Sequence, residues 1–302
     1  MQDMPLDENQ DWKESFDRLS QIRETGDYTL ETVEFIRGEM QSFDERIRAA
    51  AVLAAGGCVF EPYILDQLIN IAEYDETPAI RKAAVQSMSG VISEGVAEGM
   101  EDASGADTQL DDAEEWEEFQ AGSLRDDYQR VKNLLFNYLE YDEDIEVREL
   151  ALTALADLGS MPEIQAFIEE LFSSDRPESK LAALRTMGKY PQNWLDHLHQ
   201  LIKPETQTEL LREAVSASYS SESRMLAKAI EGILDQSDDP QTIQFALLTL
   251  TNINKTENLP DILQKFVLHS DPLVQETARD SINKYTQMNF EKYMRDDFGM
   301  ED

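Results

Sequence analysis

Few residues in this sequence have side chains that could support catalysis. Histidine occurs three times, at His197, His199 and His269, and cysteine occurs once, at Cys58. His197 and His199 are two residues apart, so on a helix they point to different sides and cannot easily hold one metal ion. Cys58 lies in an apolar stretch, which is more typical of a small buried side chain than of a nucleophile. These residues predict no metal centre and no nucleophilic site.

The sequence motifs of phosphate binding and hydrolysis are incomplete or absent. Residues 90–95 read Gly-Val-Ile-Ser-Glu-Gly, which has the glycine spacing of a phosphate loop, but Val96 and Ala97 follow where Lys and Ser or Thr are needed. The patterns GxGxxG, GxSxG and HExxH do not occur. His199 falls on an apolar stripe beside Leu198, where we expect a hydrogen-bonded core histidine. We predict no enzymatic activity and no cofactor, with an enzyme built on a groove as an alternative.

The composition is strongly acidic. Asp and Glu number 62 and Lys and Arg 26 in 302 residues, a formal net charge of −36. Proteins bind phosphate backbones with basic side chains, so this balance argues against direct nucleic-acid binding. The first residues are acidic where a signal peptide would be basic, and the longest apolar run, residues 49–60, is too short to span a membrane. We expect a cytoplasmic protein that is a monomer rather than an obligate oligomer.

A repeat organises most of the chain. Seven segments share one order of residue types, and their first residues, here called anchors, are 33, 67, 32, 31, 32 and 32 residues apart. The fourth residue after every anchor is alanine, and the next residue is aliphatic in all copies except the last, which has Arg279. These positions form one apolar stripe of a helix, and the alanine allows a neighbouring helix to approach closely. The anchors are Ile47, Ile80, Val147, Ser179, Leu210, Thr242 and Val274.

A second amphipathic helix is predicted before each of these helices. Ile64, Leu65 and Leu68 show its apolar spacing in one copy. The turns between the two helices carry Asp-Pro at 239–240 and 271–272, where Asp can cap free N–H groups and Pro suits the first helical position. The predicted unit is therefore a helix, a capped turn and a second helix.

The pattern Asp-x-x-(Ile/Val)-Arg-x-x-Ala-(Val/Leu) resembles the HEAT-repeat signature over residues 29–287, apart from one insertion. Its short period is similar to that of the compact HEAT-like repeats named after phycobilisome lyases. The resemblance implies an all-α fold, an α-solenoid of about seven stacked HEAT-like helical hairpins, and it implies no lyase activity. It also implies a structural role for the basic residue that follows the anchor in the first four copies: Arg48, Arg81, Arg148 and Lys180.

The repeats suggest five segments along the chain. We expect an acidic segment and an N-terminal capping helix at 1–28, two repeats at 29–92, an acidic flexible insertion at 93–124, five repeats at 125–287 and an acidic tail at 288–302. The capping helix is predicted from its amphipathic spacing of large apolar residues: Trp12, Phe16, Leu19 and Ile22.

The insertion is the most acidic part of the sequence. No Lys or Arg occurs from residue 83 to 124, and its glycines oppose regular structure, so we predict a mobile loop. Trp116 and Phe119 are unusual in such a solvated acidic run, and with Glu114 and Glu115 they are candidate partner-binding residues. Their aromatic rings could contact the protein's own body or its concave face, or they could dock on a basic, grooved partner.

Three basic residues complete the candidate binding set. Lys82, Arg185 and Arg212 lie away from the apolar stripes of their helices, where either a concave groove or solvent would accommodate them. We hypothesise a non-enzymatic scaffold or adaptor that binds a protein partner through its concave face and its insertion, and a basic partner would complement the acidic chain. The alternative is an acidic decoy that mimics nucleic acid and sequesters a basic partner.

Overall fold

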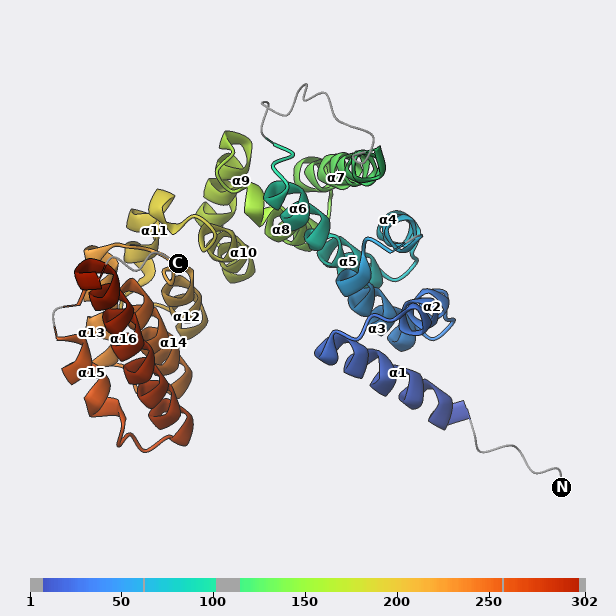
Figure 1. Cartoon of the computed structure of the whole chain (residues 1–302). Coiled ribbons are helices and arrows are strands. Elements are labelled where there is room, and N and C mark those ends of the chain that lie inside the picture. The colour runs from blue at the N-terminus through green and yellow to red at the C-terminus, as the bar shows by residue number, and fades with distance from the viewer. Residues whose placement is uncertain (1–7, 62, 102–114, 257, 299–302) are drawn as a thin grey trace. The chain divides into compact units, whose positions relative to one another are not determined.

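The computed structural model of the chain describes residues 8–61, 63–101, 115–256 and 258–298 (Figure 1), and side chains within 12–61, 63–101, 124–256 and 258–291. Within these ranges every regular element is helical. The chain divides into two compact units, residues 1–164 and 165–302, and each unit is described by itself.

Unit 1 consists of helical hairpins and two short 3₁₀ helices. Its elements are α1 (Glu8–Thr25), α2 (Leu30–Glu39), α3 (Glu45–Ala55), η1 (Gly56–Cys58), α4 (Ile64–Tyr74), α5 (Pro78–Ser87), α6 (Ser89–Ala97), α7 (Glu115–Tyr141), α8 (Ile145–Ala154) and η2 (Ala156–Leu158). The hairpins are α2–α3, α4–α5 and α7–α8. The second helices of these hairpins pack against one another in the order α3, α5, α8, which is the stacking of a solenoid.

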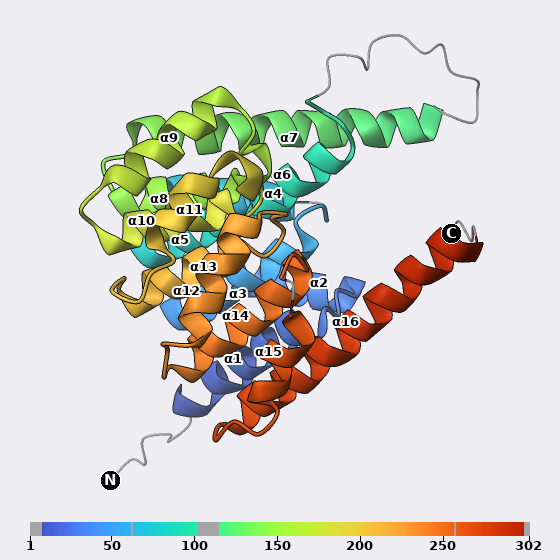
Figure 2. The same ribbon diagram turned by 90° about the vertical axis from the view of Figure 1, so that its left-hand side faces the viewer.

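Unit 2 is also built from helical hairpins. Its first helix is α9 (Pro162–Ser173), whose first three residues precede the boundary between the two units. Its further elements are α10 (Pro177–Met187), η3 (Pro191–Asn193), α11 (Leu195–Leu201), α12 (Thr208–Ala217), α13 (Arg224–Leu234), α14 (Pro240–Ile253), α15 (Leu259–Phe266) and α16 (Pro272–Phe298). The second helices α10, α12, α14 and α16 pack in that order, and α13 and α15 pair with α14 and α16 (Figure 2). The predicted all-α solenoid is confirmed.

The repeated alanines belong to the buried faces of the second helices. All seven have no exposed surface, as expected for positions at which a neighbouring helix approaches closely. The aliphatic residues that follow them are buried as well, whereas Arg279, at the same position in α16, is exposed. The buried alanines are Ala51, Ala84, Ala151, Ala183, Ala214, Ala246 and Ala278.

The turns within the hairpins share a hydrogen bond that the sequence repeat did not reveal. In six copies, the side chain of the residue five positions before the anchor accepts a hydrogen bond. The donor is the backbone N–H of the residue three positions before the same anchor. Such local bonds hold a tight turn in one conformation. The predicted helix N-caps come directly after two of these turns. Asp239 accepts the backbone N–H of Thr242 at 2.7 Å, and Asp271 accepts the backbone N–H of Leu273 at 2.9 Å. The accepting side chains are those of Ser42, Asp75, Asp142, Ser174, Ser237 and His269.

The long 67-residue spacing does not interrupt the stack. Helix α5 packs directly against α8, although 57 residues separate Ser87 from Ile145. Helix α6 follows α5 in the sequence and packs against α7. The ring of Tyr128 on α7 lies against Gly95 on α6, where an added Cβ would be 2.1 Å from the ring. The hydroxyl of Tyr128 donates to Glu101. A glycine that looked like a helix breaker is thus a packing contact within α6.

The structure differs from the expected segments at two places. Residues 93–97 belong to α6 and residues 115–124 to α7, so helix occupies both ends of the range expected as a loop. Helix α16 continues to Phe298, so residues 288–298 extend a helix rather than form a separate tail. Residues 102–114 and 299–302 lie outside the described residues, and the flexible insertion stays a prediction there.

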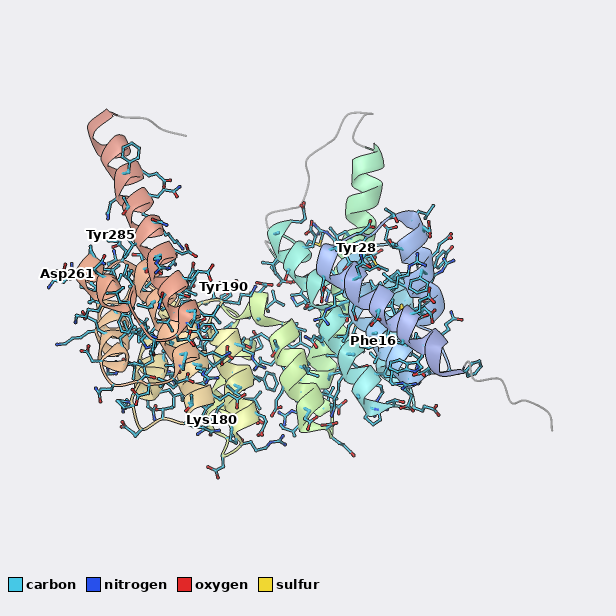
Figure 3. The ribbon with its side chains drawn as sticks, turned by 90° about the horizontal axis from the view of Figure 1, so that it is seen from below. Phe16, Tyr28, Lys180, Tyr190, Asp261 and Tyr285 are labelled. Atoms are coloured by element: carbon cyan, nitrogen blue, oxygen red, sulfur yellow. The ribbon has the colours of Figure 1, made fainter. Side chains whose placement is uncertain are left out.

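Helix α1 packs against α3, with Leu19 and Ile22 buried. Figure 3 shows the side chains of this region, with Phe16 on α1 and Tyr28 in the turn that leads to α2. The Tyr28 ring approaches the backbone of Gly57 closely, since a Cβ there would lie 2.0 Å from the tyrosine hydroxyl oxygen. That α1 serves as a cap stays a prediction.

Candidate protein-binding surface

The lysine predicted as a groove residue joins two neighbouring second helices. Lys82 on α5 lies 2.9 Å from Asp144 and 2.5 Å from Glu146 at the start of α8. The hydrogen bonds that Lys82 donates to Glu146 and Asp144 raise its pKa above the ordinary value. Lys82 is therefore a bridge across the stack, and its contact with a partner stays a prediction.

The two predicted arginines also join second helices, in unit 2. Arg212 on α12 forms a two-pronged ion pair with Asp239, with N–O distances of 2.9 and 2.7 Å, and donates to Gln241 at 2.6 Å. Arg185 on α10 lies 3.4 Å from Glu213 on α12. Each of these cations is paired with a carboxylate of the next second helix. Their role in partner binding also stays a prediction.

The bridges made by Lys82 and Arg212 obey one rule of position. Each cation stands two residues after its anchor, and each acceptor, Asp144 or Asp239, stands three residues before the next anchor in the stack. The acceptor also caps its own helix, because Asp144 accepts the N–H of Glu146 at 2.9 Å. One carboxylate thus starts a helix and fastens it to its neighbour.

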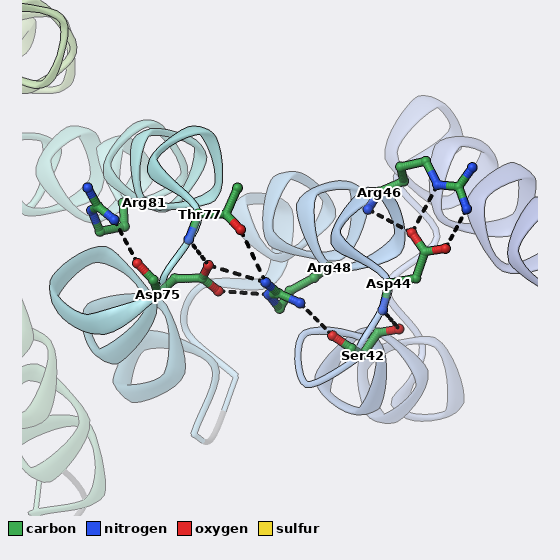
Figure 4. A network of polar contacts seen from close by, with 7 residues as sticks. All are labelled: Ser42, Asp44, Arg46, Arg48, Asp75, Thr77 and Arg81. Atoms are coloured by element: carbon green, nitrogen blue, oxygen red, sulfur yellow. Dashed lines mark hydrogen bonds and ion pairs between the residues drawn. The ribbon is translucent and has the colours of Figure 1, made fainter.

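A more buried network connects the first hairpins of unit 1 (Figure 4). Arg48 lies 2.7 Å from Asp75, with only 11% and 7% of the two side chains exposed, and it also donates to the carbonyl oxygen of Ser42 at 2.7 Å. Burial alone would raise the pKa of Asp75, but the hydrogen bonds from Arg48 and the N–H of Thr77 hold it below its ordinary value. This geometry confirms the structural role that the HEAT resemblance implied for Arg48.

The basic residue after the anchor makes the same kind of hydrogen bond to a backbone carbonyl in three copies. Arg48, Arg81 and Arg148 each donate to a backbone carbonyl near the end of the preceding helix, at 2.7, 2.7 and 2.8 Å. Carbonyl groups at helix ends lack an internal partner, so the arginines satisfy them and close the hairpin. The acceptors are the carbonyl oxygens of Ser42, Asp75 and Leu139.

The candidate residues of the insertion are not brought into a described site. Glu114 lies outside the described residues. Glu115, Trp116 and Phe119 belong to the first turns of α7, but their side chains are outside those that the structure describes. Their role in partner binding stays a prediction.

The strongest candidate surface is a row of side chains along α14 that sequence reasoning missed. Gln241, Phe245, Leu248 and Asn252 are spaced by four, three and four residues, so they share one face of the helix. Phe245 and Leu248 are 39% and 41% exposed, whereas the apolar residues on the opposite face are buried. We call these four residues the α14 stripe. Over its length of roughly 16 Å, the two apolar side chains lie at the centre.

Polar contacts hold both ends of the α14 stripe. At one end Gln241 accepts a hydrogen bond from Arg212 on α12. At the other end Asn252 donates to the carbonyl oxygen of Tyr219 at 2.9 Å and accepts from Lys284 on α16 at 3.1 Å. Lys284 also donates to the Tyr219 hydroxyl at 2.9 Å. The stripe is thus fixed to both neighbouring second helices.

A signal for this surface is present in the sequence. Residues 243–250 read Ile-Gln-Phe-Ala-Leu-Leu-Thr-Leu, with more apolar residues than one buried stripe needs. The excess falls on Phe245 and Leu248. A helix with apolar residues on a second face either is buried all round or exposes a contact surface.

None of the candidate chemical residues belongs to the α14 stripe. Cys58 is buried, and burial raises the pKa of its thiol to about 11, so it is unreactive at neutral pH. The prediction that His199 is a core residue is wrong, because it is half-buried while Leu198 fills the core of the short α11. His197 instead packs beside Trp194, with its Nε2 3.1 Å from Glu169.

The described residues contain no group of three His, Cys, Asp or Glu side chains placed to hold a metal ion. None of the helices that the structure describes is both long and apolar enough to cross a membrane.

Comparisons with known proteins place the fold among helical repeats. No protein-family model matches the sequence, and no curated protein matches it. Yeast importin-β (Kap95p) matches with a TM-score of 0.51 and 14% identity, over 91% of this chain and 38% of that one. The yeast Kap95:Nup1 complex matches with the same score and identity, over 85% and 36%. An archaeal HEAT-like repeat protein from Thermococcus onnurineus NA1 is 14% identical, with a TM-score of 0.33, over 94% and 99%.

The two yeast likenesses show that this chain has a helical-repeat fold like that of importin-β. The chain spans less than two fifths of the yeast protein chains that it matches. The compact phycobilisome-lyase type of repeat stays a prediction.

Proposed function

We propose that this protein is a non-enzymatic repeat scaffold that binds a protein partner through the α14 stripe. The observation that carries this proposal is the exposure of Phe245 and Leu248 side by side on a second helix whose other apolar residues are buried. An aromatic and an aliphatic side chain with a polar rim are typical of the centre of a protein interface. The bridges to α12 and α16 support the same proposal, because a fixed surface loses less conformational entropy when it binds.

The fold supports a binding role by analogy. One of its likenesses is a complex between two proteins, Kap95 and Nup1, and solenoids offer extended surfaces for such contacts. In this proposal the protein acts in the cytoplasm as a monomer. The acidic insertion, with Trp116 and Phe119, is a second contact for a partner with a basic surface.

The experiment compares two double variants of the tagged full-length chain. Phe245→Ser with Leu248→Ser removes the apolar centre of the α14 stripe. Leu268→Ser with Leu273→Ser removes two exposed leucines of the same unit that lie outside the stripe. Proteins recovered from cells of the source organism are identified by mass spectrometry, and the binding of each purified partner is then measured by calorimetry.

We expect the stripe variant to weaken binding at least tenfold and the leucine control to leave it unchanged, because buried aromatic anchors dominate interface energies. A purified partner that binds the stripe variant as tightly as the wild type would refute the proposal. The decoy hypothesis predicts a different result, in which binding is lost steeply with added salt and does not depend on Phe245 or Leu248.

A further inference from the structure

The accessible surface at the α14 stripe continues onto both neighbouring second helices. Tyr219 follows α12 with 41% of its surface exposed, and Lys284 is an exposed residue of α16. Asn252, at the end of the stripe, contacts both: it donates to the carbonyl oxygen of Tyr219 and accepts from the ammonium group of Lys284. Tyr219 and Lys284 therefore form one end of the surface that has Phe245 and Leu248 at its centre.

Two neutral groups hold the ammonium group of Lys284 in place. It donates to the hydroxyl oxygen of Tyr219 at 2.9 Å and to Oδ1 of Asn252 at 3.1 Å, and it lies 5.3 Å from the centroid of the Tyr219 ring. An ammonium group has three N–H donors, so one of them has no protein partner in this arrangement. Because the three N–H bonds are tetrahedral, the two hydrogen bonds also fix the direction of the third donor.

The protein does not neutralise the charge of Lys284. Among the described residues no carboxylate forms an ion pair with it, and both of its hydrogen-bond acceptors are uncharged. The carboxylate nearest in sequence is that of Asp280, one turn earlier on α16, which forms no ion pair with Lys284 either. A fixed, exposed cation with a free donor is complemented by a negatively charged group of a partner.

Positions along α14 set the spacing that a partner must match. Asn252, which holds Lys284, follows Leu248 by four residues and Phe245 by seven, or about 6 Å and 10 Å along the helix axis. A partner that covers these two apolar side chains therefore places its adjoining residues beside Lys284. At the opposite end of the stripe, the charge of Arg212 is already paired with a carboxylate. The surface thus has an apolar centre and an unpaired positive charge at one end only.

We infer that the α14 stripe recognises a partner segment in which an aspartate or glutamate adjoins apolar residues, an inference that rests on the proposed function. The apolar side chains of the segment pack on Phe245, Leu248 and the ring of Tyr219. Its carboxylate accepts the free N–H of Lys284. The stripe thus favours an acidic segment although the whole chain has a net charge of −36, and it disfavours a basic one, because Lys284 repels a second cation.

Selection from a peptide library on the full-length chain provides the probe. Random short peptides are displayed with a blocked C-terminus, so that only side chains supply carboxylates, and the tightest binder is synthesised and titrated by fluorescence anisotropy. We expect apolar residues next to Asp or Glu to be enriched. Selection of no peptide, or of peptides in which Lys or Arg adjoins the apolar residues, would overturn the inference.

Charge variants then locate the contact. Lys284→Gln in the protein, or replacement of the acidic residue of the peptide by its amide, should each weaken binding about fivefold. The two changes together should weaken binding little more than either alone, because they remove the same pair. Lys265→Gln, which removes an exposed lysine of α15, is the matched control and should bind as the wild type does. Asp280→Asn should bind at least as tightly as the wild type, because it removes a negative charge one turn from Lys284.

The outcomes distinguish this inference from the proposed function. Full binding by a correctly folded Lys284→Gln variant, additive effects of the two charge changes, or weaker binding by Asp280→Asn would overturn the inference. If Phe245→Ser with Leu248→Ser still weakened that binding, the proposed function would stand. Peptides that bind the Phe245→Ser, Leu248→Ser variant as tightly as the wild type would count against both.

Discussion

Replacement of Asp239 by Asn separates the two tasks of one carboxylate. In the wild type Asp239 caps α14 by accepting the N–H of Thr242, and it receives two hydrogen bonds from Arg212 on α12. An asparagine retains an oxygen for the cap but has no charge for the arginine. The variant Asp239→Asn therefore weakens the link between α12 and α14 and leaves the start of α14 intact.

The magnitude follows from the titration of the carboxylate. Burial opposes ionisation, but the hydrogen bonds from Arg212 and Thr242 prevail and lower the pKa of Asp239 from 3.8 to about 2. A difference of that size corresponds to about 2.5 kcal/mol if the pair were shielded from water. The side chain of Asp239 is 31% exposed, so solvent screening reduces our expectation to about 1 kcal/mol for the lost charge. Asp239→Ala also removes the cap and should cost about 2 kcal/mol.

Urea unfolding measured by circular dichroism gives the free energy of unfolding, and amide hydrogen exchange in the first turn of α14 shows where stability is lost. The local measurement matters because stacked repeats need not unfold in one step. A lowered pKa in the folded state means that the stabilisation is present above about pH 4 and is lost as the pH falls toward 2. We expect the difference between wild type and Asp239→Asn to be about 1 kcal/mol at pH 7 and to vanish near pH 2.

The next repeat provides the matched control. Asp271 caps α16 at the equivalent position, but the residue that corresponds to Arg212 is Gln244, and no ion pair to Asp271 occurs among the described residues. Asp271→Asn should therefore cost clearly less than Asp239→Asn. Equal costs for the two variants, or a difference that does not shrink at low pH, would refute the reasoning. In the opposite direction, Gln244→Arg should create the missing bridge and stabilise unit 2 by about 0.5 kcal/mol.

Two further predictions concern unit 1, and each is checked by urea unfolding. Gly95→Ala would drive a Cβ into the ring of Tyr128 and should destabilise the protein by about 2 kcal/mol, whereas Gly90→Ala in the same helix meets nothing closer than 3.6 Å and should be neutral or stabilising by up to about 1 kcal/mol. Equal effects of the two glycine variants would contradict this account of α6. Arg48→Met leaves the buried carboxylate of Asp75 without its arginine and should lower the free energy of unfolding by about 3 kcal/mol. Arg46→Met removes an exposed pair and should lower it far less. Similar losses for the two variants would show that burial does not set the strength of these pairs.

The fold could be predicted because its main signal is local and repeated. An alanine recurs at one position of each second helix, and the structure places every one of these alanines in a fully buried contact. The Asp-Pro caps at 239 and 271 were equally predictable, since an N-cap bond joins residues only two or three apart. Regularities of this kind depend on neighbours along the chain, which the sequence displays directly.

The candidate sites were less predictable because they depend on contacts between repeats. Wheel positions placed Lys82 and Arg212 outside the apolar stripes, but not opposite Asp144 and Asp239, which come from the next hairpin in the stack. Gly95 was interpreted as a breaker because its partner, Tyr128, lies 33 residues away. Phe245 and Leu248 resemble core residues until the structure shows which face of α14 is already covered.

Helices α5 and α8 are neighbours in the stack although α6 and α7 lie between them in the sequence. The two helices contact each other directly, and α6 and α7 pack beside them, so the stack sets requirements on these helices but not on the number of residues that join α6 to α7. Insertions or deletions between α6 and α7 could therefore be accepted while the neighbouring hairpins keep their register. New recognition elements can therefore be added between α6 and α7, by evolution or by protein engineering, without any change to the stacked helices.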